Sequence, residues 1–151
     1  MGSPLSPRRW SERSDESPQR DGSGEVCRAL AACRTGNNLE LLASFYSEDA
    51  FYLDPAIPHG VTGKSALLTY FRKRLAYNAN WVWRQIEGLP MEGGFMNEWR
   101  AGIPVGEKVL EVVGVCFVQL DAEGKIRRNE VYFDHAQLLA EIESLRKSGG
   151  A

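Results

Sequence analysis

Four β-strand segments follow one another in the second half of the sequence, between residues 81 and 133. Apolar and polar residues tend to alternate within them, which is the period of a strand that buries one face. The connections contain glycine, and "DAEGK" over 121–125 is a hairpin signal. Strands joined by such short turns pair antiparallel. The segments are 81–87, 95–101, 109–120 and 126–133. They predict a meander on which the rest of the chain must pack.

Helical patterns stand before and after this meander. In the helix after Gly63, for example, apolar residues recur at the spacing of one helix face. The turn residues "TGNN" separate the first two helical segments. The predicted helices cover 25–34, 39–46, about 63–77 and about 135–147, and a short strand covers 50–54. Helices first and a run of strands afterwards indicate an α+β fold.

Composition limits the kind of protein. Residues 1–24 are Ser, Pro, Gly and charged residues with almost no apolar content, so we expect a disordered tail followed by one domain over 25–147. A net charge of -2 gives no reason to expect a nucleic acid as partner. No apolar run reaches the ~18 residues of a membrane helix. The three cysteines form no spaced framework, which is typical of a reduced compartment. We therefore expect a soluble, cytoplasmic domain.

Several short motifs do not indicate a functional site. "GVTGKS" at 60–65 ends like a phosphate-binding loop, but Pro58 stands where that loop needs its first glycine. His59 and His135 are the only histidines and have no neighbour at metal-ligand spacing, so no metal site is predicted. The basic run 72–74 on the predicted helix is interpreted as a solvated helix face.

The strand that ends in "FYLDP" carries the strongest candidate for a functional group. Asp54 follows an apolar run and precedes Pro55, which keeps it out of the helical region. The aspartate either ends the strand as a turn residue or brings a carboxylate into a pocket. Because alternate residues share one face of a strand, Tyr52 points the same way as Asp54. His59, in the Pro-bounded loop that follows, is a second polar candidate that could exchange a proton with Asp54.

Two stretches in this order resemble the nuclear transport factor 2-like (NTF2-like) superfamily, in its SnoaL-like and ketosteroid-isomerase-like branch. They are "FYSEDAFYLDP…GVTGKSALLTYF" and "GVCFVQLDAEGKIRRNEVYFD", and the resemblance covers roughly 25–145. It implies a cone, in which a strongly curved, mostly antiparallel sheet wraps around three helices with a C-terminal helix, leaving an apolar pocket open at one end. Such proteins include isomerases, cyclases, epoxide hydrolases, dehydratases and non-catalytic adaptors, so fold alone does not decide function.

The resemblance also implies a role for Asp54. In the ketosteroid-isomerase pattern the Asp of the Asp-Pro pair is the general base. The two oxyanion donors of that pattern fall near Ala29 or Leu30 and at Cys116, which cannot supply them. In the epoxide-hydrolase pattern of the same fold, the Arg and two Asp positions hold Phe95, Asn97 and Val131. Neither of these two arrangements is therefore expected.

Because side chains alternate between the two faces of a strand, a further group of residues is expected on the side that faces the pocket. Buried amides and carboxylates need hydrogen-bond partners. These buried polar side chains either form hydrogen bonds with each other and with nearby backbone, or they bind a ligand. The predicted catalytic residues are Tyr52, Asp54 and His59, and the predicted substrate-binding residues are Phe95, Asn97, Trp99, Val112, Cys116, Asn129, Val131 and Phe133.

Together these features predict a cofactor-free enzyme that acts on an apolar, carbonyl-containing compound of polyketide, terpenoid or steroid type. Asp54 would transfer the proton in an isomerisation, cyclisation or hydration. The alternative is a non-catalytic module that carries a hydrophobic ligand or docks a partner protein. A homodimer through the outer sheet face is compatible with either function.

Overall fold

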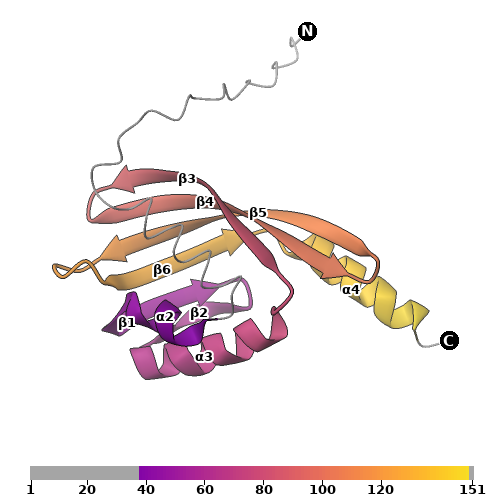
Figure 1. The fold of residues 1–151 in the computed structure, drawn as a ribbon, viewed down its shortest axis with the longest axis horizontal. Helices are drawn as coiled ribbons and strands as arrows, with labels where there is room; N and C mark the ends of the chain where they lie inside the picture. The colour runs from indigo at the N-terminus through magenta and orange to yellow at the C-terminus, as the bar shows by residue number, and fades with distance from the viewer. Residues whose placement is uncertain (1–37, 150–151) are drawn as a thin grey trace, which may run out of the picture.

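The computed structural model describes residues 38–149 (Figure 1). The predicted tail over 1–24 and the predicted helix over 25–34 lie outside these residues. The elements are α2 (Leu39–Ser44), β1 (Tyr46–Asp54), β2 (Ile57–Thr62), α3 (Lys64–Tyr77), β3 (Val82–Met91), β4 (Gly94–Val105), β5 (Lys108–Leu120), β6 (Ile126–Phe133) and α4 (Ala136–Ser148). No helix in this part of the chain is long and apolar enough to cross a membrane.

One mixed sheet organises the domain. Its strand order is β2-β1-β6-β5-β4-β3. The strands β3 to β6 form the predicted antiparallel meander, whereas β1 pairs parallel to β6. The β-branched residues of β5 explain its length of 13 residues, because valine is favoured on a pleated, half-buried surface. The α+β prediction is confirmed: a six-stranded, mostly antiparallel sheet carries helices that include a C-terminal one.

The hairpin formed by β1 and β2 corrects two sequence-based predictions. His59 was expected in a Pro-bounded loop after Asp54, but residues 57–62 form β2, which pairs antiparallel with β1. The Asp54 side chain makes this reversal possible, since its Oδ1 accepts hydrogen bonds from the backbone N–H groups of Ala56 and Ile57 at 2.8 and 3.2 Å. The helix predicted over 39–46 ends at Ser44, because Tyr46 already pairs with β6 as the first residue of β1. Helical periodicity in so short a segment cannot detect that competition.

The helices cover two different parts of the sheet (Figure 1). Helix α3 contacts β1 and β2, and it buries Leu67, Phe71 and Leu75 along one side. Helix α4 lies beneath the far part of the β4–β5 hairpin, where Lys108 and Glu141 form an ion pair at 3.6 Å. The space between α3 and the sheet is therefore bounded by β1, β6 and the start of β3, and it holds the candidate site.

Candidate functional site

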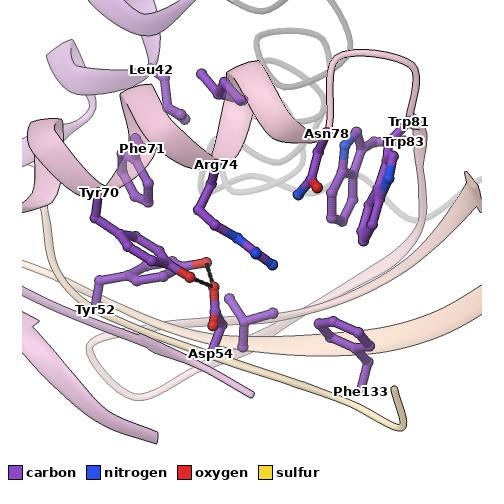
Figure 2. A pocket seen from close by; sticks show the side chains of 12 residues that line it. Leu42, Tyr52, Asp54, Tyr70, Phe71, Arg74, Asn78, Trp81, Trp83 and Phe133 are labelled. Atoms are coloured by element: carbon purple, nitrogen blue, oxygen red, sulfur yellow. Dashed lines mark hydrogen bonds between the residues drawn. The ribbon is translucent and has the colours of Figure 1, made fainter. Parts of the chain in front are cut away.

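A narrow cavity lies between α3 and the inner face of the sheet (Figure 2). Its volume is about 40 Å³. This is well below the ~300–1,000 Å³ typical of sites that enclose a whole ligand. Most of its lining is aromatic or aliphatic. The lining residues are Leu42, Tyr52, Asp54, Tyr70, Phe71, Arg74, Leu75, Asn78, Trp81, Trp83, Val131 and Phe133. The cavity thus holds only a small group, and a larger ligand must extend beyond it.

An open groove adjoins the cavity at the carboxyl ends of the neighbouring parallel strands β1 and β6. Its volume is about 490 Å³, and its walls are mostly apolar. It is lined by Leu53, Asp54, Pro55, Pro58, Val131, Tyr132, Phe133 and Asp134. Asp54, Val131 and Phe133 line both spaces. Asp54 therefore borders both spaces.

The Asp54 carboxylate is buried and accepts four hydrogen bonds. The residue is only 6% exposed. Its Oδ2 accepts from the hydroxyl of Tyr70 at 2.6 Å and from that of Tyr52 at 3.1 Å, as Figure 2 shows. Its Oδ1 accepts from the two backbone N–H groups of the β1–β2 turn. Two oxygens have about four lone-pair positions, so the acceptor capacity of this carboxylate is filled. The two alternatives left open for Asp54 are thus both realised, because one residue shapes the turn and faces the cavity.

Helix α3 supplies a polar stripe that the sequence analysis did not assign to the site. Tyr70, Arg74 and Asn78 are four residues apart, and this spacing places them on one face of a helix. They lie beside the apolar stripe that α3 buries against the sheet. Arg74 had been grouped with its exposed neighbours as a solvated face. It is instead half-buried and lines the cavity, whereas Arg72 and Lys73 are exposed. The spacing of the three residues from Leu67, Phe71 and Leu75 could have indicated this stripe.

Two tryptophans form the far wall of the cavity and were also not predicted. The rings of Trp81 and Trp83 lie 5.4 Å apart. Trp83 packs on Trp99 at 4.8 Å, and Trp99 in turn packs edge-on against Phe133 at 5.5 Å. Their one-residue separation, which places both on the same side of the chain as it enters β3, was the available signal. These rings form a continuous aromatic wall from Trp81 to Phe133.

The structure brings together some of the predicted site residues and separates others. The inner-face pattern is confirmed, since Phe95, Asn97 and Trp99 on β4 are all buried, as are Val112 and Cys116 on β5. Of the predicted residues, Tyr52, Asp54, Val131 and Phe133 line the cavity. The buried residues that do not line it are Phe95, Asn97, Trp99, Val112, Cys116 and Asn129. His59 lies exposed on β2 and lines neither the cavity nor the groove.

Two hydrogen bonds made by residues behind the lining hold the sheet and its aromatic wall. The indole N–H of Trp99 donates to the Cys116 sulfur at 3.1 Å. The side-chain amide of Asn129 donates to the Tyr46 hydroxyl at 2.8 Å, and both residues are 1% exposed. This second bond links β6 to β1 beneath the cavity. A direct contact of these residues with substrate stays a prediction.

Tyr46→Phe is expected to lower the free energy of unfolding by about 1–3 kcal/mol, because the buried amide of Asn129 loses its acceptor. Urea denaturation followed by circular dichroism measures the change. The control is Tyr132→Phe, since Tyr132 is 45% exposed. Adding Asn129→Leu to Tyr46→Phe should restore part of the loss, because the buried amide that lost its acceptor is then removed as well. Equal stability of the two Tyr→Phe variants would contradict this role.

Within residues 38–149, no three His, Cys, Asp or Glu side chains lie close enough together to hold a metal ion. The polar groups that line the cavity are a hydrogen-bonded carboxylate, two phenols, a guanidinium and an amide. Such groups can bind an oxygen-containing ligand and can move a proton.

Neither a protein-family model nor a curated protein sequence matches the chain. Solved structures do match. One is a protein with a ketosteroid isomerase-like fold from Catenulispora acidiphila, in complex with trimethylamine. It is 21% identical with a TM-score of 0.69, and the match covers 80% of this chain and 94% of that one.

A second similar structure is a Mycobacterium tuberculosis protein in complex with estradiol-17β-hemisuccinate. It is 17% identical with a TM-score of 0.62, and the match covers 74% of this chain and 93% of that one. A third is a candidate SnoaL-like polyketide cyclase from Shewanella putrefaciens, at 13% identity and a TM-score of 0.68, covering 87% of this chain and 90% of that one. The structural neighbours are thus NTF2-like, SnoaL-like and ketosteroid isomerase-like proteins, and the fold of this chain is NTF2-like.

Proposed function

We propose that this domain of NTF2-like fold is a small-molecule enzyme in which Asp54 moves a proton on an apolar, carbonyl-containing substrate. The observation that carries the proposal is the Asp54 carboxylate, buried between two tyrosine hydroxyls at the junction of the cavity and the groove. Proton transfer needs a base within hydrogen-bond reach of the substrate. A carbonyl substrate also needs a donor aimed at the oxygen that gains charge.

Tyr70 is the donor best suited to the substrate oxygen. Its hydroxyl belongs to a half-buried side chain on α3 and lies 2.6 Å from the carboxylate. When a carbonyl oxygen enters the cavity, this hydroxyl can turn from Asp54 to the carbonyl. The turn frees one lone pair on Oδ2, and that lone pair then accepts the proton from the carbon beside the carbonyl. One movement thus creates the base and stabilises the enolate oxygen.

Tyr52 has the other role, which is to hold the carboxylate in place. It is only 4% exposed, and its ring packs edge-on against Phe71 at 4.9 Å. With its ring enclosed, it is less able than Tyr70 to follow a ligand. Two backbone N–H groups hold the opposite oxygen of Asp54. The carboxylate therefore stays oriented while its Tyr70 bond is exchanged.

The two spaces favour a substrate with an apolar body. The groove is walled by Leu53, two prolines and Phe133, and the cavity behind Asp54 admits only a small group. A ring system lying in the groove would present its carbonyl to Asp54 and Tyr70. A neighbour of the same fold in complex with an estradiol derivative supports this choice of ligand class.

The second candidate function is a non-catalytic carrier of a hydrophobic ligand. One observation favours it: every acceptor position of Asp54 is already filled by a donor from the chain. If Tyr70 does not leave the carboxylate, Asp54 is a structural residue and the cavity only binds. The two functions therefore differ in whether the Tyr70 hydroxyl changes partner.

A matched pair of tyrosine variants tests the proposal. The assay follows exchange of the α-protons of 2-tetralone, an apolar ketone, in deuterated water by NMR. Tyr70→Phe is expected to slow the enzyme-dependent exchange by about 100-fold, as removal of an oxyanion donor does. Tyr52→Phe, which removes the other hydroxyl from the same oxygen, is expected to slow it by less than about tenfold, the worth of one ordinary hydrogen bond.

Exchange that equals the buffer rate with the wild-type protein, together with saturable binding of 2-tetralone, would favour the carrier. Equal effects of the two variants would show that Tyr70 has no special role. Thermal melting of each variant separates these results from loss of the fold.

A further inference from the structure

The cavity contains a guanidinium that no carboxylate of the described chain neutralises. Arg74 is half-buried, and its side chain makes no hydrogen bond or ion pair with any of residues 38–149. Its guanidinium lies over the ring of Tyr70, with Cζ 6.0 Å from the ring centroid. Figure 2 shows the guanidinium extending into the cavity, between Asp54 and the two tryptophans. A charge in such a place is normally paired.

Asp54 does not serve as that partner. Among residues 38–149 it is the only carboxylate that lines the cavity, and no oxygen of it lies within 4.0 Å of the guanidinium. Its acceptor positions are used by Tyr52, Tyr70 and the β1–β2 turn. Within residues 38–149 the positive charge of Arg74 is therefore left without a compensating anion, and a ligand can supply one.

Asn78 adds an independent sign that the cavity is built for a polar ligand group. It lies one helical turn beyond Arg74, is 9% exposed and lines the cavity. Its Oδ1 is buried and has no hydrogen-bond partner among the residues that the structure describes. An amide oxygen left in this state costs stability unless a ligand or water donates to it. Arg74 and Asn78 together thus form an unsatisfied polar end of an otherwise apolar space.

The surfaces around this polar end are flat and aromatic. Trp81, Trp83 and Phe133 line the cavity and are each only partly buried. Such rings accept the face of an aromatic or polycyclic ligand. A guanidinium binds a carboxylate through two parallel hydrogen bonds, which adds direction to the charge attraction.

We infer that the site takes an organic acid, namely an apolar ring compound whose carboxylate binds Arg74. The inference concerns the same site as the proposed function and names its substrate class: an apolar carbonyl compound that also bears a carboxylate. The small cavity holds the carboxylate, and the ring body extends past Phe133 into the groove. A cationic ligand held by the tryptophans and Asp54 is the opposite arrangement, and Arg74 in the cavity would repel it.

Three matched ligands test this inference on the full chain by calorimetry at low salt. They share a naphthalene ring and differ in charge: 2-naphthylacetate, 2-naphthylacetamide and (2-naphthylmethyl)trimethylammonium. The acetate is expected to bind at least about tenfold more tightly than the amide, because its hydrogen bonds to Arg74 are charge-assisted. The ammonium compound is expected to bind most weakly.

Variants on α3 assign the preference to one residue. Arg74→Gln should abolish the tenfold preference while leaving the amide affinity within about twofold. Arg72→Gln removes the same charge from an exposed position two residues away and should keep the preference. Arg74→Lys keeps the charge without the planar fork and should retain only part of it.

Equal affinities for acetate and amide, or no binding of either, would overturn the inference without any variant. Tighter binding of the ammonium compound would overturn it in favour of an aromatic cage for cations. Failure here is distinguishable from failure of the proposed function. Asp54→Asn should keep the preference for the acetate although it removes proton exchange, whereas Arg74→Gln should lose the preference.

Discussion

Asp54→Asn is expected to slow the α-proton exchange of 2-tetralone by about a thousandfold, within the usual range for loss of a general base. The amide has nearly the shape of the carboxylate, and its oxygen can still accept from the backbone N–H groups of Ala56 and Ile57. The hydroxyls of Tyr52 and Tyr70 can rotate to accept from the new NH₂ group. The variant should therefore fold while lacking a base. NMR exchange rates and a thermal melt of the same sample measure both properties.

Asp134→Asn is the matched control for this experiment. Asp134 lines the same groove but is exposed, and its Oδ1 accepts from the backbone N–H of Ala136 at 2.9 Å at the start of α4. Its loss should change the exchange rate by less than about twofold, since it lies outside the cavity. Full turnover in Asp54→Asn would show that Asp54 is not the base.

Gly114→Ala is expected to lower the free energy of unfolding by about 2–3 kcal/mol, as overpacking of a filled core does. Gly114 on β5 lies opposite Trp99 on β4. An added Cβ would lie 2.2 Å from Cζ2 of the Trp99 ring. Trp99 is 3% exposed and is held by the Cys116 sulfur, so the indole cannot move without disturbing the aromatic wall. Urea denaturation gives the loss of stability.

The control is Gly102→Ala, also in the sheet. There an added Cβ would lie 3.5 Å from Val109 Cγ1, which is an ordinary contact. Its unfolding free energy should stay within about 0.5 kcal/mol of the wild type. Gly114→Ala should also weaken the binding of 2-naphthylacetate, because Trp99 packs on Trp83 and Phe133 of the cavity lining. Two glycine variants of equal stability would show that the space beside Trp99 can relax.

The strand β1 was predictable from sequence, whereas its neighbour β2 was not. The alternation in "AFYLD" correctly placed Tyr52 and Asp54 on one buried face. After a two-residue turn, residues 57–62 form β2, although they include a proline and a glycine. Edge strands tolerate proline, because one side of the strand needs no hydrogen bonds. Propensity along the chain does not reveal which segment will lie at an edge.

Local sequence patterns predicted the order of helices and strands in the described part of the chain apart from β2, and the buried face of β1, β4, β5 and most of β6. These are local properties, since the two-residue period of a strand and the apolar stripe of a helix depend only on neighbours along the chain. The same reasoning identified Asp54 and its companion Tyr52. It could not decide which inner-face residues would border the cavity and which would be covered.

Which inner-face residues border the cavity depends on the tertiary packing of α3 against the sheet. The rotation of α3 on the sheet brings the stripe of Tyr70, Arg74 and Asn78 over the end of β1, and it turns Arg74 inward while Arg72 stays in solvent. The same packing leaves Asn97 and Asn129 behind the lining. The physical reason is that adjacent stripes on a helix are separated by only a fraction of a turn. The stripe that faces the cavity therefore depends on how the helix docks on the sheet. That docking is set by contacts between residues far apart in the sequence.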